Sequence, residues 1–166
     1  MPIGMAATDY GIPSLFEAFI LTTQSPAHCV FTEGCITLPD GYTDRTVNAF
    51  VPGKEGDAAI TVTRDTLNEG ESLNDYIDRQ LALMSQHLKG WKTQQREAIW
   101  LGQQVLEGEG VQASYLRDGQ RIWQQQAVFA LDSAHILVFT LSKTAVLSDV
   151  DVSRFNVLLG SFTFNQ

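Results

Sequence analysis

The stretch Ser72–Leu88, SLNDYIDRQLALMSQHL, is the one long segment of this chain with an unambiguous amphipathic pattern. Its apolar residues recur at spacings of three and four, so they lie on one side of a helix. Ser72 supplies an N-terminal cap and Gly90 a stop beyond the last turn. A helix with a single apolar side needs a surface to pack on. The stretch therefore predicts a helix that lies on a β-sheet.

Gln80 interrupts this apolar stripe or lies at its margin. A buried amide without a hydrogen-bond partner costs about 1–3 kcal/mol, so Gln80 needs a partner. One interpretation is a glutamine at the edge of the stripe that reaches solvent or a neighbouring carbonyl. The other is a binding role, which depends on what surrounds it.

Short runs with strand character lie on both sides of the predicted helix, and Asp118-Gly119 between two of them is a strong hairpin signal. A second helix is predicted over Ser148–Leu159, followed by a short extended tail at 161–164. Gly108 and Gly110 are interpreted as turn glycines. This order predicts an α+β fold, an antiparallel sheet with helices packed on it. The predicted strands are Val30–Leu38, Thr46–Val51, Ala58–Arg64, Trp91–Leu101, Gln103–Glu107, Val111–Arg117, Gln120–Leu131 and His135–Ser142.

The length of 166 residues predicts one domain with an adequate core. A net charge of −8, from 11 basic and 19 acidic residues, argues against binding to nucleic acid. Residues 1–29 differ from the rest because proline and glycine punctuate them, and Ser14–Leu21 is a short helix at most. This extension is an arm, a docking peptide or a non-native start, so the predicted domain spans residues 30–166.

Cys29 and Cys35 both fall near the first predicted strand. Their even separation places them on one face of a strand but roughly 20 Å apart, too far for a mutual disulfide. We therefore expect reduced thiols. The sequence also shows no secretory signal and no apolar run near the ~20 residues of a membrane span, which predicts a cytoplasmic protein without stable membrane insertion.

Motifs of known catalytic or metal sites do not occur in the sequence. His28, His87 and His135 stand in separate contexts, and there is no H-E-x-x-H, no G-x-S-x-G and no phosphate-binding glycine loop. The sequence therefore predicts a protein that is not an enzyme and that holds no metal or other cofactor.

The run Gln120–Leu131 has two different faces when read with the period of a strand. The first, expected to face the core, contains Trp123, Gln125, Ala127, Phe129 and Leu131. The second mixes aliphatic and amide side chains: Ile122, Gln124, Gln126, Val128 and Ala130. A half-exposed strand that tolerates glutamine would have this pattern. A groove that accepts an apolar helix and offers it a few hydrogen bonds would have it too.

Four segments in order resemble a known family: Phe31–Phe50, Arg64–Leu67, Tyr76–Leu81 and Gln124–Phe129. They are similar to the DcrB-related family, which includes the Eag chaperones of bacterial type VI secretion. The resemblance covers Val30 to about Phe164 and leaves residues 1–29 outside it.

The resemblance implies a PsbP-like α+β fold, a homodimer, and a cytoplasmic chaperone. Such a chaperone holds the N-terminal transmembrane helices of a cognate effector, typically one with a PAAR domain and often with Rhs repeats, before the effector is loaded on the secretion spike. The alternatives are a DcrB-like envelope-associated or uptake-related protein without catalytic activity, and a small-molecule-binding or enzymatic domain. The residues that the resemblance implies for client-helix binding are Gln80, Gln124, Gln126, Ile36, Leu38, Ile122 and Val128.

Overall fold

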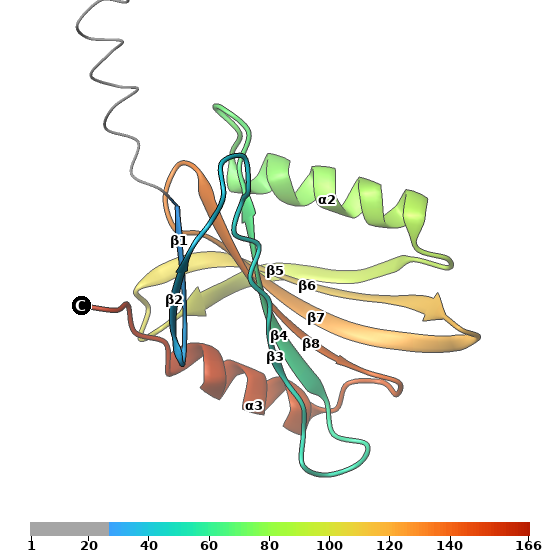
Figure 1. Ribbon diagram of the computed structural model, residues 1–166. Helices are drawn as coiled ribbons and strands as arrows, with labels where there is room; N and C mark the ends of the chain where they lie inside the picture. The colour runs from blue at the N-terminus through green and yellow to red at the C-terminus, as the bar shows by residue number, and fades with distance from the viewer. Residues whose placement is uncertain (1–26) are drawn as a thin grey trace, which may run out of the picture. The chain divides into compact units, whose positions relative to one another are not determined.

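Antiparallel strands in the order β3-β4-β8-β7-β6-β5 form the central sheet of the computed structural model, which describes residues 27–166 (Figure 1). Strands β5 to β8 follow one another as a meander, and β4 joins this meander at its β8 side. The strands are β3 (Asn48–Phe50), β4 (Ala59–Thr66), β5 (Lys92–Leu101), β6 (Leu106–Arg117), β7 (Gln120–Ala130) and β8 (His135–Lys143).

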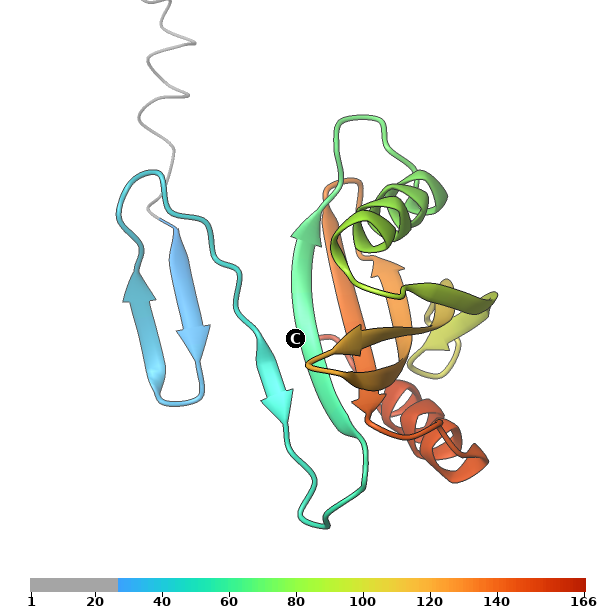
Figure 2. The ribbon, with the colours of Figure 1, turned by 90° about the vertical axis from the view of Figure 1, so that its right-hand side faces the viewer.

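Two helices pack on this sheet, one on each face (Figures 1 and 2). Helix α2 (Leu73–His87) begins at Ser72, whose side chain accepts a hydrogen bond from the Asp75 backbone N–H. Helix α3 (Asp149–Gly160) begins at Ser148, which forms a reciprocal capping box with Asp151. Both predicted helices are thus confirmed, as is the predicted α+β class.

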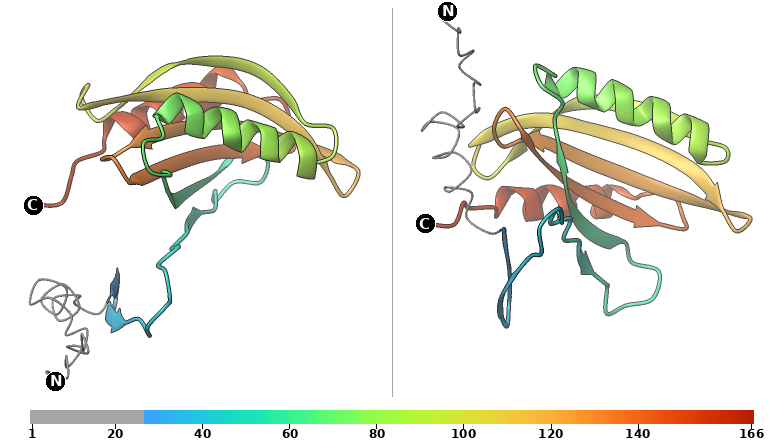
Figure 3. Two further views of the ribbon diagram at one scale, coloured as in Figure 1. Left: turned by 90° about the horizontal axis from the view of Figure 1, so that it is seen from above. Right: turned by 45° about the horizontal axis from the view of Figure 1, so that its top comes forward.

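The alternation of side chains along β7 assigns each helix its own core. Phe129 and its neighbours on the α3 face pack against Phe155 and Leu159. Val128, on the other face, packs against Tyr76 and Ile77 of α2. The β7 face that carries the glutamines is therefore partly covered by α2, while both views in Figure 3 show β6 and β7 curving beside this helix.

The region around Gly108 differs from the prediction of a separate strand at Gln103–Glu107. Residues 102–105 form a turn, and β6 continues unbroken through Gly108 and Gly110. A Cβ atom at Gly108 would overlap the Val128 carbonyl oxygen and the Phe129 ring. Gly108 thus permits a close approach between β6 and β7. The prediction that it is a turn glycine was wrong.

The described chain divides into two units, one ending at Asp44 and the other beginning at Arg45, and the sheet with its helices belongs to the second. In the first unit, β1 (His28–Phe31) and β2 (Gly34–Thr37) form a hairpin where the sequence predicted one strand. The register pairs Cys29 with Ile36 and Val30 with Cys35, so the two thiols lie on opposite faces and not on one. They are not joined in a disulfide. The predicted separation of roughly 20 Å along one strand was wrong, because the hairpin places the two residues at neighbouring positions on paired strands.

Two sequence predictions concern the ends of the chain. The helix at 14–21 and nearly all of the proposed arm at 1–29 lie outside the described residues. At the other end, the chain leaves α3 at Ser161 without forming another strand, and the Phe162 ring contacts Phe139 edge-to-face at 6.4 Å. Across residues 27–166, no helix combines the length and apolar character needed to cross a bilayer.

Candidate functional site

A cavity of about 320 Å³ lies between α2 and the sheet, and we call it the α2 cavity. Its walls come from α2 on one side and from β4, β7 and β8 on the other. The volume is near the lower end of the range of about 300–1,000 Å³ for ligand pockets. The lining residues are Thr63, Arg64, Asp65, Tyr76, Ile77, Gln80, Leu81, Met84, Gln124, Gln126, Val128, Val138 and Thr140.

Three glutamine side chains converge on this cavity from two elements. Gln80 comes from α2, and Gln124 and Gln126 come from the same face of β7. Gln124 is only 7% exposed, whereas Gln80 and Gln126 are half-buried. Within residues 27–166, none of the three amides has a hydrogen-bond partner in the chain. Their donors and acceptors are therefore available to water or to a bound molecule.

Aliphatic side chains fill the space between these amides. Ile77, Leu81 and Met84 contribute from α2, while Val128 and Val138 contribute from adjacent strands. A methionine in such a wall adapts its shape readily because its side chain is unbranched and flexible. The cavity thus combines an apolar wall with a few neutral hydrogen-bonding groups.

Asp65 and Tyr76 of the cavity lining belong to a network of hydrogen bonds and ion pairs that extends beyond the cavity. The Tyr76 hydroxyl donates a 2.8 Å hydrogen bond to Asp65, whose carboxylate also lies 3.6 Å from the Arg45 guanidinium. Burial and the neighbouring Asp65 carboxylate raise the pKa of the Tyr76 hydroxyl well above its usual value, so it stays protonated and remains a donor. The Arg79 guanidinium lies over the Tyr76 ring. It also donates two hydrogen bonds to the Glu71 carboxylate.

Sequence reasoning missed Asp65 and Tyr76 as partners. No sequence motif marks Asp65 as a binding residue, and Tyr76 is one of the apolar-stripe residues of Ser72–Leu88. Their pairing depends on how α2 lies relative to β4, which neither local segment specifies. The only available signal was the aromatic hydroxyl itself, because a buried tyrosine usually finds a hydrogen-bond partner.

The structure brings together four of the seven residues predicted for client binding, namely Gln80, Gln124, Gln126 and Val128. Ile122 shares their face of β7 but lies outside the cavity lining, and its side chain is only 4% exposed. The remaining two belong to the first unit: Ile36 lies on β2 and is 51% exposed, and Leu38, just beyond β2, is half-buried.

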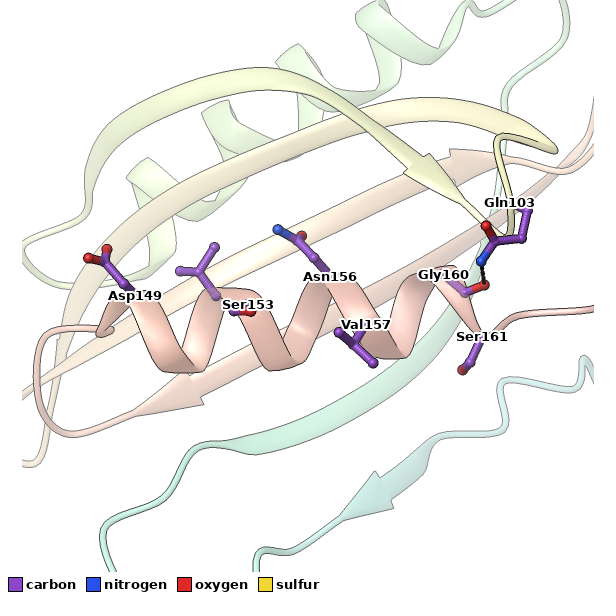
Figure 4. Close-up of a pocket in the computed structure, with 8 residues that line it drawn as sticks. Gln103, Asp149, Ser153, Asn156, Val157, Gly160 and Ser161 are labelled. Carbon is purple, nitrogen blue, oxygen red and sulfur yellow. Dashed lines mark hydrogen bonds between the residues drawn. The ribbon is translucent and has the colours of Figure 1, made fainter.

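The described residues offer no group of three His, Cys, Asp or Glu side chains placed to hold a metal ion. A larger hollow of about 760 Å³ follows the outer side of α3 (Figure 4). Figure 4 shows its side chains spread along the helix, with Gln103 donating a 3.1 Å hydrogen bond to the Gly160 carbonyl. Its polar groups do not converge on one point, so the α2 cavity is the better candidate site.

The Glu71–Arg79 pair beside the cavity predicts a dependence of stability on pH. Hydrogen bonds from Arg79 and from the Asn68 backbone lower the pKa of Glu71 from 4.5 to about 2. A carboxyl whose pKa is lower in the folded state stabilises it above its usual pKa, and this contribution disappears as the pH falls towards the lowered value. We expect the free energy of unfolding to fall more steeply between pH 4.5 and 2 in the wild type than in Glu71→Gln.

Urea unfolding at a series of pH values measures both slopes. Glu69→Gln is the matched control because it removes a carboxyl charge from the same loop without disturbing the bonds to Arg79. Equal slopes for the wild type and Glu71→Gln would show that the pair does not stabilise the folded state.

The DcrB family model matches residues 33–161. Because this match covers most of the chain, the protein belongs to the DcrB family. The matched range includes the whole sheet, both helices and every residue of the α2 cavity. No curated protein sequence matches the chain.

The solved structures similar to this one include PA94 and LpqN. The crystal structure of PA94 from Pseudomonas aeruginosa, described as a protein of unknown function, has a TM-score of 0.66 at 20% identity and covers 85% of this chain and 98% of its own. At that identity, the similarity shows a shared fold. LpqN of Mycobacterium tuberculosis, described as involved in cell envelope biogenesis, has a TM-score of 0.46 at 13% identity and covers 82% of this chain and 81% of its own.

Proposed function

We propose that this DcrB-family protein is a chaperone that binds and shields apolar helices of a client protein. The observation that carries the proposal is the convergence of Gln80, Gln124 and Gln126, all without partners in the described chain, on a cavity with an aliphatic wall. Amides of this kind fix the register of a bound helix through hydrogen bonds without burying a charge, which would be costly.

The physical need for such a chaperone follows from the client. A transmembrane helix outside a membrane exposes about 20 mostly apolar residues, and burying each large side chain is worth about 1.5–3 kcal/mol. Without a cover, such a helix aggregates or inserts into the wrong membrane. A cavity of about 320 Å³ is far smaller than a 20-residue helix, which is about 30 Å long and about 10 Å across, so the client helix lies outside it and inserts side chains.

The resemblance to the Eag chaperones indicates which client this protein would bind. It is the N-terminal transmembrane region of a type VI secretion effector with a PAAR or Rhs module, held in the cytoplasm before loading on the spike. In this role the protein acts as a homodimer and carries out no catalysis. The residues expected to contact the client are those of the α2 cavity.

Co-expression with the N-terminal region of the effector encoded beside this gene tests the proposal. We expect stable capture in an affinity pull-down, a native mass that contains both proteins, and loss of capture when the apolar helices of the effector are deleted. Gln80→Ala/Gln126→Ala should weaken binding by about 10–100-fold, because each lost hydrogen bond costs about 0.5–1.5 kcal/mol and leaves a client group unpaired.

Gln120→Ala is the matched control, since this exposed glutamine at the start of β7 lies outside the cavity. It should bind the client as tightly as the wild type. If the effector region is soluble alone and never associates with the wild-type protein, the chaperone proposal is wrong. If the double variant binds normally, the client lies elsewhere on the protein.

Membership of the DcrB family favours a second candidate, an envelope-associated or uptake-related protein without catalytic activity. Cell fractionation separates the two functions. Cofractionation with the envelope in the absence of any effector supports this second function, and recovery in the cytosol together with an effector supports the first.

A further inference from the structure

A patch of neutral polar side chains covers part of the sheet face that bears the α2 cavity. The register places Gln126, Thr140 and Thr61 in one row across β7, β8 and β4, and Gln124 and Ser142 in the row beside it. Residues directly opposite each other in a sheet point to the same side, so these side chains share one face. We call these five residues and Thr63 the polar patch.

The polar patch lacks internal hydrogen bonds. None of its hydroxyl or amide groups bonds to another side chain or to the backbone within the part of the chain that the structure describes. Gln124 is buried, and the other five are half-buried. These groups therefore rely on water, and any segment that covers them must replace that water.

The neutrality of the polar patch limits what can cover it. It contains hydrogen-bond donors and acceptors but no charge, and the valines at 128 and 138 lie beside it on the same face. The charged residues that also line the cavity, Arg64 and Asp65, already have partners within the chain, so a charged segment would lose its hydration without gaining a free ion-pair partner. A purely aliphatic segment would leave the patch dry and unpaired.

On the basis of the proposed function, we infer that the polar patch selects its client by polarity: it takes an apolar helix that carries one stripe of hydroxyl, amide or other small polar side chains, and it rejects a uniformly aliphatic helix. A site built to form hydrogen bonds discriminates strongly against a ligand that lacks the matching groups, because its own polar atoms are then buried unpaired.

The spacing of the rows indicates how the helix lies. Neighbouring strands are about 4.8 Å apart, and successive turns of an α-helix are about 5.4 Å apart. A helix that crosses β7, β8 and β4 along the row of Gln126, Thr140 and Thr61 therefore presents one turn to each strand. Its polar residues belong at positions i, i+4 and i+7, which lie on one side of the helix.

Labelled 20-residue helical peptides test this inference with the full-length protein. The first is a leucine-alanine helix with serines at i, i+4 and i+7. The second has the same composition with its serines spread around the helix, and the third has leucine in place of serine. Identical lysine pairs at the ends keep all three in solution. Fluorescence anisotropy at one fixed salt concentration measures each Kd.

We expect the striped peptide to bind about tenfold more tightly than the scattered peptide and more tightly still than the all-aliphatic one. In Thr61→Val/Thr140→Val, which keeps the side-chain shapes but removes two hydroxyls, this preference should fall to about twofold or less. Thr66→Val changes the opposite face of β4 and should keep the tenfold preference.

The outcomes separate this inference from the proposed function on which it rests. Equal binding of all three peptides would overturn selection by polarity and leave the chaperone function standing. An unchanged preference in the double valine variant would overturn the role of the polar patch. If neither the peptides nor the effector region binds the wild-type protein, the chaperone function and the inference both fail.

Discussion

Replacement of Phe155 by alanine is expected to lower the free energy of unfolding by about 3–5 kcal/mol. The Phe155 side chain is fully buried. It packs α3 against the hydrophobic cluster of the sheet that contains Phe129 and Phe139. Truncation removes the buried ring and leaves a cavity that the sheet cannot close. Urea unfolding followed by far-UV circular dichroism measures the loss.

Val157→Ala is the control on the same helix, because this side chain is 72% exposed. It should change the free energy of unfolding by less than about 0.5 kcal/mol. Similar losses in the two variants would mean that α3 does not pack on the sheet through Phe155.

Replacement of Lys143 by methionine is expected to cost about 3 kcal/mol at neutral pH, the lower end of the range for breaking a buried ion pair. The ammonium of Lys143 lies 2.5 Å from the Asp151 carboxylate, and the two side chains are 15% and 7% exposed. Burial alone raises the pKa of Asp151, but the bonds from Lys143 and Ser148 outweigh it and hold this pKa below its usual range. Without Lys143, the Asp151 charge is left buried and only partly compensated.

The stability difference between the wild type and Lys143→Met should narrow as the pH falls. In the wild type, the lowered pKa of Asp151 contributes stability above the usual pKa of an aspartate, and protonation removes it at low pH. In Lys143→Met, protonation of Asp151 neutralises a buried charge that has lost its partner, so the destabilisation becomes smaller. Chemical unfolding at pH 7 and at pH values below 3.8 measures both differences, and a gap in the free energy of unfolding that stays constant would contradict the role of the pair.

The parts of the fold with local signals could be predicted from the sequence. Helix α2 has a capping serine, a stripe with helical spacing and a terminal glycine, all within one segment. The hairpin between β6 and β7 has Asp118 and Gly119 at its turn, both with positive φ. These features act over a few residues, so no knowledge of distant contacts was needed.

Two predictions about local structure were wrong. In one, the role of a residue depends on a residue distant in sequence, and in the other, a short turn was interpreted as part of a strand. Gly108 is required by the approach of the Phe129 ring from the next strand, and the same glycine in an isolated segment indicates a turn. The β1–β2 turn is made by Thr32 and Glu33 and is followed by Gly34, a single glycine that is also compatible with an irregularity inside one strand. The run was therefore interpreted as one strand.

The candidate site was predictable to the extent that it depends on periodicity. Alternation along β7 placed Gln124 and Gln126 on one face, and Gln80 stood out as a polar residue in an apolar stripe. The meeting of these three side chains, and the pairing of Asp65 with Tyr76, depend on the position of α2 over the sheet. That position is a property of the packed fold and of no single segment.

The pairing of β4 with β8 has a consequence for the order in which the protein folds. Strands β5 to β8 pair with their neighbours in sequence, whereas Thr66 of β4 pairs with His135 of β8, beyond α2 and three strands. Contacts between distant segments form slowly, because a long loop must close before they stabilise the chain. During synthesis, β4 can pair with β8 only after β8 has left the ribosome, so the face shared by β4, β7 and β8 cannot form before then. The α2 cavity, which takes its walls from β4, β7 and β8 as well as from α2, therefore exists only once the chain is almost fully translated.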